Sequence, residues 1–212
     1  MHLCRGPSAC SSASTVRRSL LRPRAVASGL LVLLCLLSLS GPTRAEDPVP
    51  GTAWGWGFNG NGQVGDGTTD ACNAPQEVAA LSDVISVSGG HVHTVALRSD
   101  GTVWAWGWNA YGQLGDGSIT DQHTAVQAVG LTHVVAVAAG QWHTVALKDD
   151  GTVWTWGGNS YGQLGDGTTH ERWTPDPVSG LANVVAVAAG MWHTVALKAD
   201  GTLWAWGWNG DG

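Results

Sequence analysis

Hydrophobic and polar positions beyond residue 50 follow short alternating runs. In one stretch, Val134–Ala138 is a run of β-branched and small residues, His143–Lys148 follows a glycine, and Thr152–Trp156 places two indoles on one face. A period of two is typical of a β-strand, whereas a helix repeats every 3.6 residues. The pattern therefore predicts three short strands in this stretch.

Turn residues connect these strands. Asp150-Gly151 separates the second strand from the third and is expected to supply the positive backbone angles of a tight hairpin. A loop over 157–169 follows, and the segment from Trp173 to Val178 is predicted as a short fourth strand at the sheet edge, where its two prolines are tolerated. Four short antiparallel strands of this kind make one blade of a β-propeller.

The same unit recurs every fifty residues, and such a period is typical of repeat architectures. Three short motifs return at fixed positions: His-Thr-Val-Ala-Leu, Trp-x-Trp-Gly and Gly-Gln-x-Gly. The repeat signature is carried by His93, His143, His193, Trp104, Trp106, Trp154, Trp156, Trp204, Trp206, Gly112, Gln113, Gly115, Gly162, Gln163 and Gly165.

The period divides the chain into an array and a leader. Two whole blades are predicted over 81–130 and 131–180, with partial blades over 51–80 and 181–212, a short linker over 46–50 and an export segment over 1–45. Propellers close with four to eight blades. The fold class is therefore predicted to be all-β, an incomplete propeller of about three blade equivalents. We expect a fragment of a longer reading frame, or a subunit that assembles with others, and self-association if the chain is only this long.

The repeats resemble those of the regulator of chromosome condensation family, in a tryptophan-rich form of bacterial type. The residues that carry the resemblance in one unit are Val137 to Gly140, His143, Ala146, Leu147, Gly151, Trp154 to Gly157, Asn159 and Gly162 to Gly165. The resemblance implies a seven-bladed propeller. It also implies an alternative function, guanine-nucleotide exchange as in the founding member, although no insertion interrupts the fifty-residue spacing.

The leader indicates export. Arginines at 17, 18, 22 and 24 precede the apolar run Leu30–Leu37, and small residues lead to a cleavage site before Glu46. The arginine pair fits both an ordinary secretory signal and a twin-arginine signal. The apolar run is shorter than the roughly 20 residues of a membrane span, so no stable membrane insertion is expected after signal removal. The predicted location is secreted, periplasmic or at the cell surface.

Charge and spacing exclude several classes of function. From Glu46 onward four basic residues stand against sixteen acidic ones, a net charge of −12, which disfavours nucleic acid as a partner. The three signature histidines occupy equivalent positions in successive blades and are expected to bond strands or neighbouring blades. Asp66, Asp116 and Asp166 lack the alternating oxygen ligands of a calcium loop. No metal or other cofactor is expected.

The proposed function rests on where the repeats differ. Catalysis needs unlike groups that converge on one point, and almost nothing breaks this repeat, so no enzyme is predicted. Loops on a rigid scaffold are where binding residues accumulate. The sequence therefore predicts a non-catalytic scaffold that recognises a protein, with a glycan as a further option. The candidate interaction residues are Asp121, Gln122, His123, His170, Glu171, Arg172 and Trp173.

Overall fold

The fold was analysed in a computed structural model that describes residues 50–210. The predicted export segment and nearly all of the linker lie outside the described residues. The strands are β1 (Trp54–Gly57), β2 (Cys72–Glu77), β3 (Val84–Gly89), β4 (His93–Arg98), β5 (Val103–Gly107), β6 (Gln122–Gln127), β7 (Val134–Ala139), β8 (His143–Lys148), β9 (Val153–Gly157), β10 (Arg172–Pro177), β11 (Val184–Ala189), β12 (His193–Lys198) and β13 (Leu203–Gly207). Residues 50–210 contain no helix that could cross a membrane.

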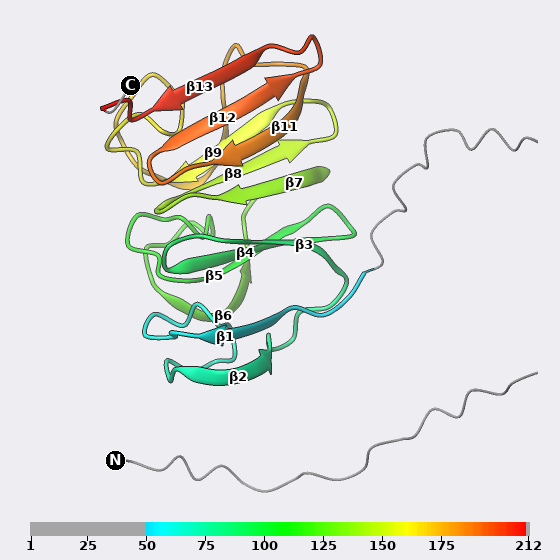
Figure 1. Cartoon of the computed structure of the whole chain (residues 1–212), viewed down its shortest axis with the longest axis vertical. Coiled ribbons are helices and arrows are strands. Elements are labelled where there is room, and N and C mark those ends of the chain that lie inside the picture. The colour runs from blue at the N-terminus through cyan, green and yellow to red at the C-terminus, as the bar shows by residue number, and fades with distance from the viewer. Residues whose placement is uncertain (1–49, 211–212) are drawn as a thin grey trace, which may run out of the picture. The chain divides into compact units, whose positions relative to one another are not determined.

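The strands form four antiparallel sheets that follow one another along the chain (Figure 1). Two are four-stranded blades, β3 to β6 and β7 to β10. The first sheet, β1–β2, corresponds to the third and fourth strands of a blade, and the last, β11 to β13, to the first three. These two sheets lie at opposite ends of the stack, so the described array is not closed (Figure 1). The prediction of four-stranded blades in an unclosed all-β propeller is confirmed.

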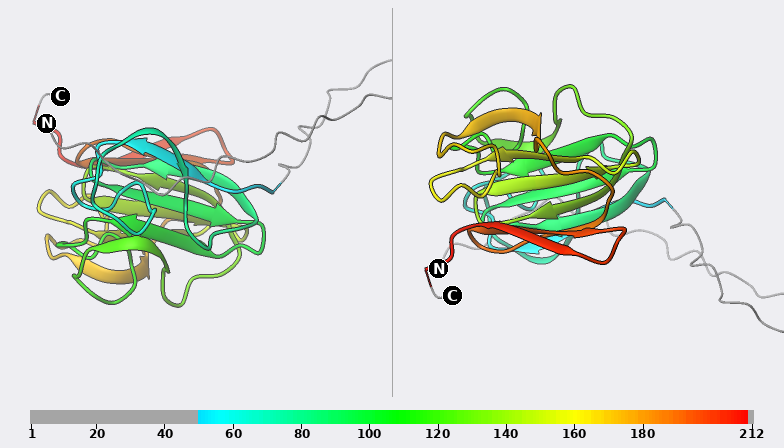
Figure 2. Two further views of the ribbon diagram at one scale, coloured as in Figure 1. Left: turned by 90° about the horizontal axis from the view of Figure 1, so that it is seen from below. Right: turned by 90° about the horizontal axis from the view of Figure 1, so that it is seen from above.

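Neighbouring blades pack mainly through their first two strands. β3 and β4 contact β7, and β7 and β8 contact β11, which places the first strands of successive blades side by side. The fourth strands β6 and β10 lie at the opposite edge of each sheet. Seen along the stack, the sheets overlap only in part (Figure 2).

The turn between the second and third strands differs from the prediction. Only the glycine of each Asp-Gly pair has a positive φ, 76° at Gly151. Gly151 donates its N–H to the Lys148 carbonyl, and Asp150 accepts the N–H of Thr152 through its carboxylate, at 3.0 Å each. This side-chain bond holds Asp150 in an ordinary turn conformation, so one left-handed residue completes a hairpin with a glycine bulge. The expectation of positive angles at both residues was wrong.

The hydrophobic core is divided among the three interfaces between sheets. In the central one, Val95 and Leu97 from one blade meet Ala146 and Trp156 from the next, and all four are at most 1% exposed. Equivalent clusters form around Trp106 at the preceding interface and beside Trp206 at the following one. Each blade therefore buries its apolar side chains largely against a neighbour, as expected of a stacked repeat.

Candidate functional site

A chain of hydrogen bonds joins each blade to the next. The indole N–H of Trp156 and the hydroxyl of Thr144 both donate to the Gln113 carbonyl of the preceding blade, at 2.9 and 2.8 Å. His93 Nε2 lies 3.2 Å from Thr144 Oγ1. Because the Thr144 hydrogen is used on Gln113, His93 must donate through Nε2. The same contacts recur fifty residues later among His143, Thr194, Gln163 and Trp206.

Burial keeps two of the three signature histidines neutral. Burial, followed by the charge of the next histidine, lowers the pKa of His93 to about 3 and that of His143 to about 4. His193 lies on the last sheet and is exposed. Within residues 50–210, no group of three His, Cys, Asp or Glu side chains is placed to hold a metal ion. His93 and His143 act as links between blades.

The signature glycines permit the close approach of the next blade. A Cβ at Gly115 would lie 2.7 Å from Trp156 Nε1, and Gly115 has a φ of 74°. A Cβ at Gly112 would lie 2.5 Å from the Cα of Trp173. The Gly-Gln-x-Gly loop is therefore held between its own blade and the following one.

The acidic residues of these loops bond their own backbone. Asp166 Oδ1 accepts the N–H of Thr168 at 2.9 Å, and Asn159 Nδ2 donates to the same oxygen. Partial burial opposes ionisation of Asp166, but the Arg172 guanidinium at 2.7 Å and these hydrogen bonds lower its pKa to about 2. Asp66 and Asp116 make the matching turn bonds. This is the hydrogen bonding of an Asx turn.

The first group of predicted interaction residues is largely engaged within the fold. Asp121 accepts the Asn109 N–H at 2.8 Å, and Gln122 donates to Asp116 at 3.4 Å. His123 packs against the preceding loop, because a Cβ at Gly62 would lie 2.5 Å from its ring. Asp121 and Gln122 thus hold the loop of their own blade, and His123 contacts the loop of the preceding blade.

The second group is only partly engaged. Arg172 forms ion pairs with Asp166 and Asp176, at 2.7 and 2.6 Å. Trp173 contacts Gly112 of the preceding blade but remains 47% exposed. His170 and Glu171 are exposed. Both groups flank the loop that contains Gly112. The first group belongs to the same blade as this loop, and the second belongs to the following blade.

Two groups of aromatic rings bridge neighbouring blades. Tyr111 lies 5.3 Å from Trp108 and 5.4 Å from Trp142 of the next blade, measured between ring centroids. Tyr161, Trp192 and Trp208 form the second group, at 5.1 to 6.3 Å. We call the surface formed by these six residues the aromatic face. Trp108 and Trp208 are separated by two repeats in the sequence, and Trp142 and Trp192 by one.

The aromatic face lies at one end of the strands, where β5, β9 and β13 finish. Tyr161 is 44% and Trp208 37% exposed there. A hollow of about 320 Å³ lies at the same end, lined by Gly90, Gly140 and Met191 among others. Trp142 and Trp192 directly follow residues of this hollow in the sequence. The hollow and the exposed rings of Tyr161 and Trp208 thus lie at the same end of the strands.

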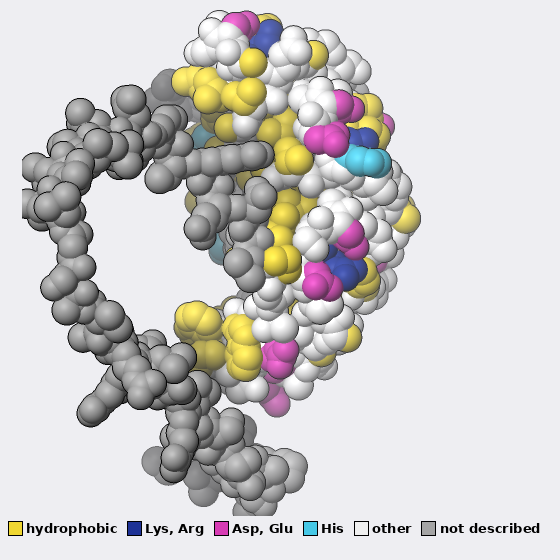
Figure 3. All heavy atoms as spheres, turned by 90° about the vertical axis from the view of Figure 1, so that its right-hand side faces the viewer, with side chains coloured by type: hydrophobic (Ala, Val, Ile, Leu, Met, Phe, Trp, Pro, Cys, Tyr) yellow, Lys and Arg dark blue, Asp and Glu magenta, His cyan; other side chains and the backbone are white. Residues whose placement is uncertain are grey.

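The opposite end of the strands carries the Asp-Gly turns and is charged (Figure 3). Arg98 pairs with Asp83 and Asp100 at 3.3 and 3.2 Å. Lys148 lies 5.3 Å from the ring centre of Trp154, an arrangement that recurs at the other turns. The three basic side chains at this end, Arg98, Lys148 and Lys198, thus lie over indoles, and two of them also pair with carboxylates.

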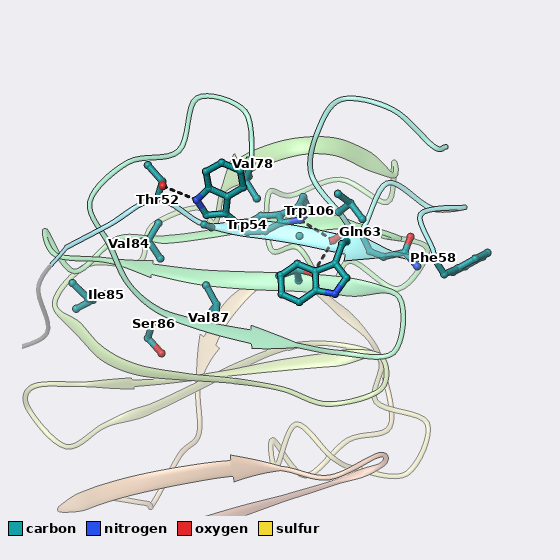
Figure 4. Close-up of a pocket in the computed structure, with 15 residues that line it drawn as sticks. Thr52, Trp54, Phe58, Gln63, Val78, Val84, Ile85, Ser86, Val87 and Trp106 are labelled. Atoms are coloured by element: carbon teal, nitrogen blue, oxygen red, sulfur yellow. Dashed lines mark hydrogen bonds between the residues drawn. The ribbon is translucent and has the colours of Figure 1, made fainter. Parts of the chain in front are cut away.

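A larger cavity of about 540 Å³ opens at the first sheet (Figure 4). One wall is formed by β1, where Trp54 and Trp56 are 55% and 63% exposed. The other wall is formed by Val84 to Val87 of β3, together with Thr94 and Trp106. This cavity lies at an end of the array and not on the aromatic face.

The blades and the repeated contacts between them define a propeller-type repeat protein. The regulator of chromosome condensation (RCC1) repeat matches residues 50–97, 100–147 and 150–197, and a second description of this repeat matches 84–113, 134–163 and 184–212. The chain belongs to the regulator of chromosome condensation repeat family, as its sequence signature predicts.

Solved structures with similar folds include human WBSCR16, with a TM-score of 0.65 and 25% identity over 72% of this chain and 42% of that chain. Yeast RCC1 (Prp20) bound to Kap60 has a TM-score of 0.46 and 22% identity over 76% of this chain and 53% of that chain. The present chain thus spans less than half of the human protein. No curated protein sequence matches it.

Proposed function

We propose that this chain is a non-catalytic scaffold that binds a protein partner through the aromatic face. The observation that carries the proposal is the pair of aromatic groups, which expose the rings of Tyr161 and Trp208 at the same end of the strands as the hollow. Tyrosine and tryptophan are enriched at protein interfaces and among the residues that dominate binding energy. His170, Glu171 and Trp173 lie at the same end toward the outer edge, and extend this surface.

Crosslinking from a defined position tests the proposal. A photoreactive amino acid replaces Tyr161 on the aromatic face or, as the matched control, the exposed Thr132 at the opposite end, in the full chain expressed in its native host. We expect a discrete adduct with one protein from position 161, lost when Trp192→Ala is added, and no such adduct from position 132. Equal labelling from both positions contradicts the proposal.

Glycan recognition is the second candidate for the same surface. It is favoured by the exposed rings of Tyr161 and Trp208, which offer flat apolar areas of the size of a sugar ring. A glycan array probed with the full chain and with the Trp208→Ala variant separates the two candidates. Binding of one glycan class that Trp208→Ala abolishes favours a glycan as the ligand.

We also propose that the protein acts outside the cytoplasm, on the basis of the leader sequence. The chain processed before Glu46 retains four basic and sixteen acidic residues. N-terminal sequencing of protein from the native host is expected to give a start near Glu46. A cytosolic protein that keeps Met1 contradicts the proposal.

A further inference from the structure

Acidic and basic residues are distributed unequally between the two ends of the strands. The loops that join the third and fourth strands lie at the end that carries the aromatic face, and they contain six acidic residues: Asp66, Asp70, Asp116, Asp121, Asp166 and Glu171. Among residues 50–210, the one Lys or Arg at this end is Arg172, the first residue of β10. It is paired with Asp166 and Asp176. Six acidic residues and one basic residue give this end a net charge of −5 with histidines neutral.

The other described basic residues lie at the opposite end. Arg98, Lys148 and Lys198 are the last residues of the second strands β4, β8 and β12, beside the Asp-Gly turns. Each of them lies over an indole of its own blade. A ligand that approaches the aromatic face therefore meets no unpaired Lys or Arg side chain of residues 50–210.

The first aromatic group of this face lies between two complete blades. Trp108 and Tyr111 belong to the blade β3 to β6, and Trp142 belongs to the blade β7 to β10. All three residues are partly exposed. The ring centroid of Trp142 lies 6.2 Å from that of Trp108 and 5.4 Å from that of Tyr111. Rings packed in this way offer apolar area together with faces of partial negative charge.

A carboxylate lies beside this aromatic group. Asp121 accepts the backbone N–H of Asn109 at 2.8 Å, and Asn109 directly follows Trp108 in the sequence. Asp121 is itself partly exposed. Glu171 occupies the equivalent position fifty residues later and is exposed. Carboxylates therefore accompany the aromatic face in two successive blades.

We propose that the aromatic face binds a segment of the partner polypeptide that is rich in arginine and lysine. This inference rests on the proposed function and names the chemistry of the partner. A cationic side chain is attracted to the negative face of an aromatic ring, and arginine also stacks flat on such rings. The cations of the segment contact Asp121 and Glu171, and their aliphatic stems cover the rings of Trp108 and Trp142.

Repetition and charge favour this occupant over others. Carboxylates and rings recur in successive blades, which fits a chain that carries several cations better than a single small cation. The net charge of −5 repels the phosphates of a nucleic acid. A second copy of this chain docked through the same face would bring two acidic surfaces together, and like charges opposed across an interface weaken binding.

A labelled peptide of alternating arginine and serine is the probe, and the same peptide with citrulline in place of arginine is its uncharged counterpart. Fluorescence anisotropy with the full chain is expected to show saturable binding of the arginine peptide and none of the citrulline peptide. The affinity is also expected to fall as salt is raised, because the Debye length shortens from about 30 Å at 0.01 M to about 10 Å at 0.1 M.

Two aspartates that make the same kind of backbone bond provide a matched pair of variants. Asp121 accepts the N–H of Asn109, and Asp150, in a turn at the opposite end, accepts the N–H of Thr152. Asparagine at either position retains the acceptor oxygen and removes one negative charge, so both variants change the net charge equally. Asp121→Asn is expected to weaken binding of the arginine peptide about threefold. Asp150→Asn is expected to leave it unchanged.

Two exposed acidic residues allow a larger change of charge. Glu171 lies at the end that carries the aromatic face, and Asp149 lies beside the turn at the opposite end. Glu171→Lys is expected to weaken binding of the arginine peptide about tenfold, because it places a like charge in the binding surface. Asp149→Lys changes the net charge equally and is expected to have no effect on binding. Because both side chains are exposed, neither substitution is expected to unfold the chain.

The contribution of the rings is tested by a second pair of variants. Trp108→Ala removes an indole from the aromatic face and is expected to weaken binding of the arginine peptide about tenfold. Trp104→Ala removes a partly exposed indole that lies under Arg98 at the opposite end, and it is expected to leave binding unchanged. Thermal melts of both variants establish that each is compared in its folded state.

Three results overturn the inference. They are the absence of saturable binding up to about 1 mM arginine peptide, equal binding of the citrulline peptide, and equal effects of Glu171→Lys and Asp149→Lys. If the crosslinked adduct from position 161 still forms, the aromatic face binds a partner of different chemistry and only this inference fails. Absence of that adduct contradicts the proposed function, and the inference fails with it.

Discussion

Trp156 donates its indole N–H to the backbone carbonyl of Gln113, 2.9 Å away and 43 positions earlier in the preceding blade. A tryptophan that defines one repeat is thus held by the loop of the repeat before it. Trp106 and Trp206 make the same bond to Gln63 and Gln163. A single repeat does not contain the hydrogen-bond acceptors that its own signature tryptophans require. Stability therefore resides largely in the interfaces between repeats.

Trp156→Phe is expected to lower the free energy of unfolding by about 2–3 kcal/mol, through the lost bond to Gln113 and a small cavity in a fully buried site. Trp154→Phe is the control, because Trp154 is half-buried and donates only to Thr152 of its own turn. Its expected cost is below about 1 kcal/mol. Urea unfolding measures both, and equal losses would contradict the role assigned to the bond between blades.

Gly115→Ala and Gly180→Ala separate backbone strain from crowding between blades. Both glycines have a positive φ, 74° and 77°, so both variants carry a left-handed alanine that costs about 1–2 kcal/mol. A Cβ at Gly115 also lies 2.7 Å from Trp156 Nε1, whereas nothing lies within 4 Å at Gly180. The Gly115 variant is therefore expected to lose about 1–3 kcal/mol more, measured by urea unfolding. A smaller loss at Gly115 than at Gly180 is incompatible with this packing.

The blades were predictable because period and local pattern agree. The alternating residues around Val137 and Thr155, with glycine turns between them, predict antiparallel strands joined by short turns. The copies fifty residues apart show the same pattern. The fourth strand begins at Arg172, one residue before the predicted start at Trp173. The turn at Asp150 was harder to predict, because the choice between two left-handed residues and one depends on a side-chain bond to Thr152.

The loop residues show where sequence reasoning ends. Differences between repeats directed attention to positions 122 and 172, yet in each repeat this side chain bonds the loop aspartate, from Gln122 to Asp116 and from Arg172 to Asp166. Different residues here perform one structural task. The aromatic face escaped prediction because Tyr111 and Trp142 lie 31 positions apart, and only the stacking of blades brings them together.

Calcium is expected not to bind the repeat loops, because turn bonds already occupy the oxygens they offer. Asp116 accepts the N–H and hydroxyl of Ser118 through its two carboxylate oxygens, and Gln122 donates to one of them as well. Calcium prefers six to eight oxygen ligands in a flexible loop. Calorimetric titration of the full chain is expected to show no stoichiometric heat. Micromolar binding that Asp116→Asn weakens would instead identify the loops as calcium sites.

The buried histidines should make the fold sensitive to mild acid. His93 and His143 have pKa values of about 3 and 4 in the folded chain, because burial disfavours the charged ring, against about 6.5 when unfolded. Between these values the unfolded chain binds more protons, so stability is complete above about pH 6.5 and falls as the pH drops toward 4. The limiting slope is about 1.4 kcal/mol per pH unit for each histidine. The lowered pKa of Asp166, about 2, costs stability only at lower pH.

Urea midpoints at pH 7, 6 and 5 measure this slope in the range where the histidines dominate. Replacing both His93 and His143 by glutamine keeps an N–H donor for Thr144 and Thr194 but removes the titrating rings. The double variant is expected to be nearly insensitive to pH over this range, whatever its stability at pH 7. His133→Gln, at an exposed turn, should keep the slope of the unmodified chain. An unchanged slope in the double variant would mean that other groups take up the protons and that the histidine links do not govern acid stability.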